Sequence, residues 1–99
     1  KRQEVASFYK DLSSYAGKTV TVCGWARSIR DSKTLGFIDL NDGTSFKGVQ
    51  IVFEDGKIDN FKEIASQNVG AALRVTGTLL ATPEAKQPFE IHASEIVVE

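Results

Sequence analysis

The order of apolar and polar residues predicts a short helix and then a strand at the start of the chain. Apolar and aromatic residues recur at the spacing of one helix face, and they are Val5, Phe8, Tyr9 and Leu12. From Thr19 the period changes to two, which is typical of a half-buried strand, and the strand continues towards Arg30. Gly24 lies inside this alternation, so we expect a bulge or a sharp bend there, with Trp25 packed beside it.

Two further strands are predicted at 35–40 and 48–53, each preceded by a polar turn. The second turn contains Asp42 followed by Gly43, and glycine tolerates the positive φ that tight hairpin turns demand. A helix follows, because Phe61, Ile64 and Ala65 form an apolar stripe.

The ends of that helix also have sequence signals. Asn60 followed by Glu63 resembles a capping box at its start, and Gly70 is expected to end it.

The last two strands are predicted at 72–80 and 89–98, joined by a loop over 82–88. Five strands with a helix between the third and fourth is the order of an OB-fold, a small Greek-key barrel. An open β-sandwich is the alternative, although sandwiches of this length usually have about seven strands and no helix. The sequence therefore predicts one mainly β domain over residues 1–99, an OB-fold with an additional short helix in front.

Strand parity predicts which side chains face outward, because alternate side chains of a strand point to opposite faces. When the apolar parity of the second, third and fifth strands faces the core, Phe37, Gln50 and Glu90 share one outer surface, with Arg30 near its rim. Asp39 and His92 should face water, and no partner gives His92 a catalytic role.

This surface has the chemistry of a base-recognition site. A phenylalanine ring can stack on a base, which is worth about 1–3 kcal/mol. A glutamine offers a donor and an acceptor to a base edge, a glutamate offers acceptors, and an arginine binds phosphate or stacks through its planar guanidinium. Phe37 alone is equally well explained as a structural or incidental residue, and Gln50 and Glu90 alone are better explained as ordinary solvated residues. The prediction therefore depends on their coincidence on one face.

The net charge of −1 restricts how nucleic acid could be bound, because proteins held by bulk electrostatics have strongly basic surfaces. Lys and Arg outnumber Asp and Glu by eight to five through Gln50, and the balance is four to eight afterwards. We therefore expect specific contacts, mainly on the N-terminal half.

Motifs for catalysis and for metal binding are absent from the sequence. Cys23 is the only cysteine and His92 the only histidine, which excludes an internal disulfide and a Cys/His zinc site. Turn and strand positions explain Asp31, Asp39 and Asp42 better than a divalent-metal cluster does. We expect no catalytic residue, metal or cofactor in this chain.

The sequence has no apolar run near the roughly 20 residues that span a bilayer and no signal-peptide pattern. A single cysteine fits a reducing compartment, so we expect a cytoplasmic protein without a membrane partner. Methionine is absent even at position 1, which indicates a piece of a longer chain.

Several segments together resemble the start of the aminoacyl-tRNA synthetases for aspartate, asparagine and lysine. They are VTVCGWAR at 20–27, IRDSK at 29–33, GFIDLNDG at 36–43, VQIVF at 49–53 and VTG at 75–77. The stretches at 30–33, 42–46 and 82–91 are similar to the asparaginyl branch. The aspartyl branch stays an alternative, since both tRNAs share the first two anticodon bases that the family recognises.

The resemblance implies an anticodon-binding OB domain. In relatives, a strand-two Phe stacks on the middle anticodon uracil, a strand-three Gln and a strand-five Glu contact that base, and an Arg contacts the same region. The loop between the last strands helps with neighbouring bases. The matching positions are Phe37, Gln50, Glu90 and Arg30, with Lys86 and Gln87 in the loop.

The resemblance also implies a catalytic domain after residue 99, which would bind ATP, Mg²⁺ and asparagine and form a homodimer, whereas this domain alone would be a monomer. Two other functions stay open. A general single-stranded nucleic-acid-binding module predicts several exposed aromatic residues and a basic groove. A protein-interaction domain or engineered binding scaffold predicts no affinity for RNA.

Overall fold

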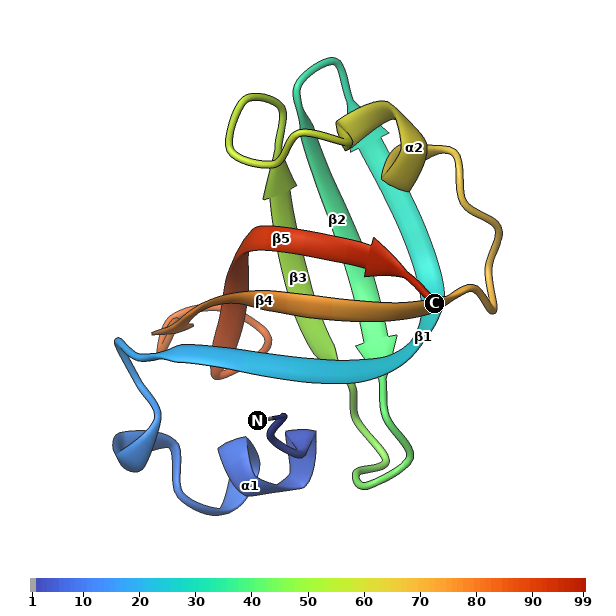
Figure 1. Ribbon diagram of the computed structural model, residues 1–99. Helices are drawn as coiled ribbons and strands as arrows, with labels where there is room; N and C mark the ends of the chain where they lie inside the picture. Colours follow the sequence, from blue (N-terminus) through green and yellow to red (C-terminus); the bar gives the residue numbers. More distant parts are fainter. Residues whose placement is uncertain (1) are drawn as a thin grey trace.

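The computed structural model describes residues 2–99, in which five strands close into a barrel with a short helix at each end (Figure 1). The strands are β1 (Thr19–Ser32), β2 (Leu35–Asn41), β3 (Val49–Glu54), β4 (Ala72–Ala81) and β5 (Phe89–Val98). The helices are α1 (Val5–Lys10), a 3-10 turn at Leu12–Ser14, and α2 (Phe61–Ala65). This order, with α2 between β3 and β4, confirms the predicted OB-fold.

The strands lie around the barrel in the order β1-β2-β3-β5-β4, and β4 pairs with β1 to close it. The pairs are antiparallel except for β3 with β5, which run parallel. Sequence neighbours therefore form the meander β1-β2-β3, and β5 is inserted between β3 and β4.

β1 reaches both sides of the barrel because it changes partner at Trp25. Up to that residue it pairs with β4, and from that residue onward it pairs with β2. A Cβ on Gly24 would collide with the backbone carbonyl of Asn41, so this close approach of two backbones requires glycine. Gly24 thus marks the predicted bend, and the bulge itself lies further on, between Ala26 and Ser28.

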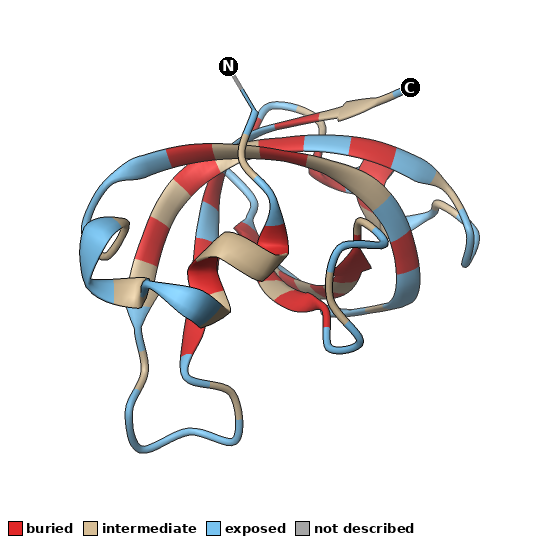
Figure 2. Ribbon diagram, turned by 90° about the horizontal axis from the view of Figure 1, so that it is seen from below, coloured by how far each residue is buried: buried red, intermediate tan, exposed pale blue. Residues whose placement is uncertain are grey.

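Buried residues alternate along the strands and face the barrel interior (Figure 2), which confirms the inward parity of the second, third and fifth strands. Helix α1 covers one end of the barrel, where the ring of Phe8 lies edge-on to Phe89 at 5.8 Å between centroids. Helix α2 lies at the other end, where Phe61 packs against Phe53 at 5.2 Å. No helix among residues 2–99 is long and apolar enough to cross a bilayer.

Two predictions around α2 are wrong. Asn60 does not cap the helix through its side chain, because its Nδ2 donates to the Glu63 carboxylate at 3.0 Å and to the Ile96 carbonyl at 2.9 Å. A bond to β5 thus replaces the local cap. The helix ends at Ala65, and Gly70, with φ of +96°, forms the turn into β4.

The predicted packing of Trp25 is also wrong, since 43% of its surface is exposed. Its side chain points outward beyond the bend, with its ring near the turn at Gly43.

Gly24→Ala should lower the free energy of unfolding by about 2–3 kcal/mol, because a backbone clash has no side-chain rotation to relieve it. Gly17→Ala is the matched control: its φ is +81° but nothing lies near the added Cβ, so the loss should be about 1 kcal/mol. Urea unfolding of both variants measures the difference. An equal or smaller loss at Gly24 would contradict the role of glycine at the bend.

Candidate nucleic-acid interface

Cross-strand pairing arranges outward side chains into two rows that run from β1 to β5. The first row consists of Arg30, Phe37, Val52 and His92. The second consists of Ser28, Asp39, Gln50 and Glu90. Neighbouring strands lie about 4.8 Å apart, so each side chain is within reach of the next in its row. We call these two rows the outer face.

Phe37 and Arg30 form a cation–π pair at one end of the first row. The guanidinium carbon of Arg30 lies 4.5 Å from the centroid of the half-buried Phe37 ring. Together with Asp31 and Ser32, these two residues line a cavity of about 270 Å³. The Phe37 ring therefore borders this cavity and lies against the exposed guanidinium of Arg30.

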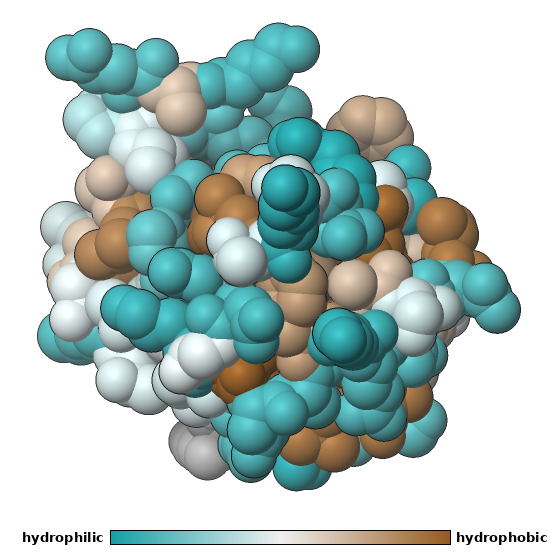
Figure 3. Space-filling model, turned by 90° about the horizontal axis from the view of Figure 1, so that it is seen from above, coloured by the Kyte–Doolittle hydropathy of each residue, from teal (hydrophilic) through white to brown (hydrophobic). Residues whose placement is uncertain are grey.

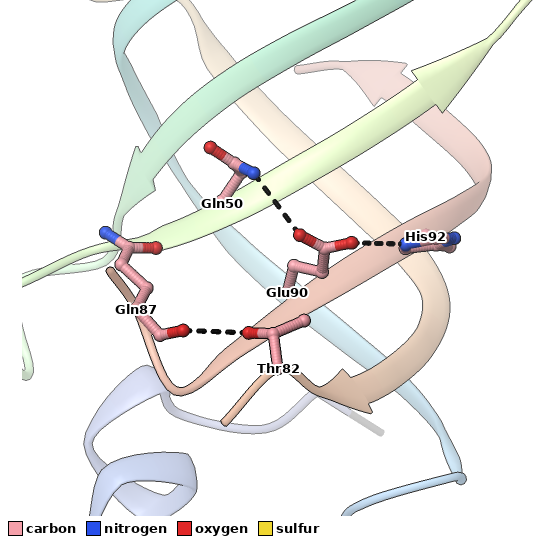
Figure 4. Close-up of polar contacts among 5 residues, drawn as sticks. All are labelled: Gln50, Thr82, Gln87, Glu90 and His92. Carbon is pink, nitrogen blue, oxygen red and sulfur yellow. Dashed lines mark hydrogen bonds and ion pairs between the residues drawn. The ribbon is translucent and has the colours of Figure 1, made fainter. Parts of the chain in front are cut away.

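Gln50, Glu90 and His92 form a hydrogen-bonded chain at the other end of the outer face (Figure 4). Gln50 Nε2 donates to Glu90 Oε1 at 3.3 Å, and His92 Nε2 lies 2.6 Å from Glu90 Oε2. Both carboxylate oxygens of Glu90 are thus engaged. Parity predicted that His92 faces outward, but its contact with Glu90 was missed, although residues two apart on a strand share a face.

Asp39 occupies the middle of the second row, and it is half-buried rather than fully solvated as expected. Its Oδ1 is buried without a hydrogen-bond partner. The hydroxyl of Tyr9 on α1 donates to the Gly48 carbonyl at 2.7 Å nearby, and burial followed by the charge of Asp39 raises the pKa of that hydroxyl. With Glu90 at the β5 end, Asp39 makes the second row acidic.

This distribution of charge has a chemical consequence. Carboxylates repel phosphate and accept hydrogen bonds, so the second row of the outer face suits the donor groups of a base edge. The cation of Arg30 at the rim suits a phosphate.

The loop between β4 and β5 borders the second row, because Glu90 directly follows it. Thr82 closes this loop: its N–H donates to the Pro88 carbonyl and its hydroxyl to the Gln87 carbonyl, both at 2.8 Å (Figure 4). The side chain of Gln87 is half-buried with its Oε1 lacking a partner, whereas Lys86 is exposed. Of the two predicted loop residues, Lys86 is the more accessible.

Phe46, in the loop between β2 and β3, is 94% exposed. Its exposure was not predicted from the sequence. This loop spans residues 42–48, close to the segment left between the predicted strands, and α1 fixes its start through bonds from the Val5 N–H to Asp42 Oδ2 at 2.8 Å and from the Ala6 N–H to Thr44 Oγ1 at 3.0 Å. Asp42 is therefore structural.

The view from above Figure 1 shows hydrophobic residues scattered among hydrophilic ones (Figure 3). Within residues 2–99, no three His, Cys, Asp or Glu side chains converge as metal ligands would.

Comparison with known proteins places this geometry in a family. Over 95 residues the chain is 57% identical to asparagine–tRNA ligase of Bacillus cereus, covering 96% of this chain and 20% of that protein. The chain thus spans one fifth of the length of the curated relatives it matches.

Solved structures show the same fold. Asparaginyl-tRNA synthetase from Pyrococcus horikoshii superposes with a TM-score of 0.76 at 22% identity, covering 86% of this chain and 20% of that one. OBody AM3L09, solved bound to hen egg-white lysozyme, has a TM-score of 0.74 at 25% identity and covers 86% and 84%. The tRNA anticodon family, described as an OB-fold nucleic acid binding domain, matches residues 20–99. The chain belongs to this family of anticodon-type OB-fold domains.

Proposed function

We propose that this domain recognises the anticodon loop of asparagine tRNA by base stacking and hydrogen bonding on the outer face. The observation that carries the proposal is the placement of Arg30, Phe37, Gln50 and Glu90 on one surface in adjacent strands. The family match and the 57% identity to an asparagine–tRNA ligase support it. The aspartyl branch is the alternative within the same family.

Stacking on Phe37 is energetically compatible with the cation–π pair in the free domain. An exposed cation–π contact is worth about 0.5–1 kcal/mol, whereas a stacked base is worth about 1–3 kcal/mol. When a base displaces the guanidinium from the Phe37 ring, stacking therefore contributes more binding free energy than the lost cation–π contact did. Arg30, once displaced, carries a free cation at the rim and can bind the phosphate of the same or the next nucleotide.

Hydrogen bonding would supply the preference for a particular base. Gln50 uses one N–H towards Glu90, which leaves its second N–H and its Oε1 for a base edge. Lys86, and with less exposure Gln87, lie where they can contact a neighbouring nucleotide.

The rest of the parent protein is part of the same proposal. As one fifth of an asparagine–tRNA ligase, the domain would contribute tRNA selection to a cytoplasmic homodimer. ATP, Mg²⁺ and asparagine would bind in the remaining four fifths. With a net charge of −1 and an acidic second row, the domain alone should bind weakly and selectively.

A general single-stranded nucleic-acid-binding module is the second candidate, because Trp25 and Phe46 are also exposed aromatic residues. Such a module stacks many bases with little preference among them. The two proposals therefore differ in which aromatic residues matter and whether the base matters.

Phe37→Ala should weaken binding of the asparagine anticodon stem-loop by about 1–3 kcal/mol, or roughly 5–150-fold, because stacking is lost. Fluorescence anisotropy with the isolated domain measures the dissociation constant. Phe46→Ala is the matched control and should leave it unchanged. Equal losses at both positions, with no effect of replacing the middle uracil, would favour the general module.

Lys86→Ala should weaken RNA binding modestly, while the base preference persists. The slope of the salt dependence should become less steep by about the amount expected for the loss of one phosphate contact. The logarithm of the association constant against the logarithm of salt concentration, for wild type and variant, gives this slope. A slope that corresponds to many phosphate contacts in the wild type would contradict recognition by specific contacts.

A further inference from the structure

The amide of Gln50 is held in one of its two orientations by Glu90. With Nε2 towards Glu90 Oε1 at 3.3 Å, the amide donates to a carboxylate. The flipped orientation would bring Gln50 Oε1 against a carboxylate oxygen, and two acceptors repel. The side chain therefore presents Oε1 away from Glu90 (Figure 4).

The carboxylate of Glu90 is in turn held by His92. The two residues lie two apart on β5 and share its outer side, with Nε2 and Oε2 2.6 Å apart. His92 is exposed and also borders a cavity of about 240 Å³ between β3, β4 and β5. The charged groups that line this cavity are Glu54 at the end of β3 and Lys57 just after it, while β4 contributes the hydroxyl of Thr78.

A fixed Gln50 amide distinguishes the two pyrimidines. Uracil carries a donor at N3, which Oε1 can accept, and an acceptor at O4 for the second N–H of the amide. Cytosine carries an acceptor at N3, which would face Oε1 without a hydrogen bond unless the amide flips or the base shifts sideways. Stacking on Phe37 limits that shift, and Glu90 opposes the flip.

We propose that His92 is a positioning residue that sets the preference of the outer face for uracil over cytosine, by holding Glu90 and, through it, Gln50. This inference rests on the proposed function, since it concerns the base stacked on Phe37. His92 acts through the other two residues and does not itself contact the recognised edge.

The role of His92 depends on the direction of its hydrogen bond to Glu90. A carboxylate only accepts, so the imidazole holds Glu90 by presenting an N–H at Nε2. Without the imidazole, the Glu90 carboxylate is free to turn, and the Gln50 amide loses the fixed partner that opposes its flip. Uracil and cytosine carry the same charge, so their affinity ratio is insensitive to the general attraction of a cation for RNA.

The test measures dissociation constants of the intact chain for two anticodon stem-loops that differ only by uracil or cytosine at the middle position. Wild type, His92→Ala, His92→Gln and the control Ser94→Ala are compared. We expect the wild type and Ser94→Ala to prefer uracil roughly tenfold. His92→Ala should lose most of this preference.

His92→Gln provides the decisive comparison, because its amide can donate to Glu90 as the imidazole does. Its preference for uracil should return. If His92→Ala keeps the wild-type ratio, or loses affinity for both RNAs equally, the role of His92 is overturned while the loss at Phe37→Ala still supports the proposed function. Failure of the wild type to bind either stem-loop would overturn both.

Discussion

In the barrel, β3 and β5 run parallel and are joined over only three positions, where Gln50 pairs with Glu90, Ile51 with Ile91 and Val52 with His92. This short pairing joins the β1-β2-β3 meander to β5. The middle pair is buried in the core, and the outer pairs place polar groups on the surface. The register of β3 with β5 therefore both completes the barrel and positions the outer face. A shift of β5 by one residue would turn Glu90 and His92 inward and bury two polar side chains.

The distribution of charge over the outer face explains how such a domain can be selective without being strongly basic. Asp39 lies in the middle of the second row and Glu90 at its β5 end, whereas the cation of Arg30 lies at the β1 end of the first row and that of Lys86 in the loop before β5. A phosphate backbone is therefore favoured only near these cations, and base edges are favoured along the second row. Affinity that comes from bulk electrostatics is low under these conditions.

Much of this arrangement was predictable from the sequence, for physical reasons that are local. Parity depends only on alternation within a strand, and it grouped Phe37, Gln50 and Glu90 correctly on one outward surface. The strand order followed from periodicity and turn residues.

The parts that were missed depend on contacts between distant segments. Asn60 bonds to the Ile96 carbonyl on β5 instead of capping its own helix, and the backbone of α1 bonds to Asp42 and Thr44 in the β2–β3 loop. The roles of the outer-face residues in RNA binding remain predictions. The bond between Glu90 and His92 could have been anticipated from their spacing, but its link to Gln50 needed the register of β3 with β5.

The central claim is that the two rows of the outer face bind RNA. Mapping backbone amide NMR shifts while the asparagine anticodon stem-loop is titrated into the domain tests it most directly. The account predicts changes concentrated on the outward residues of β1, β2, β3 and β5 and on the β4–β5 loop, with Trp25 and Phe46 unaffected. Changes centred on Trp25 and Phe46, with the outer face silent, would contradict it.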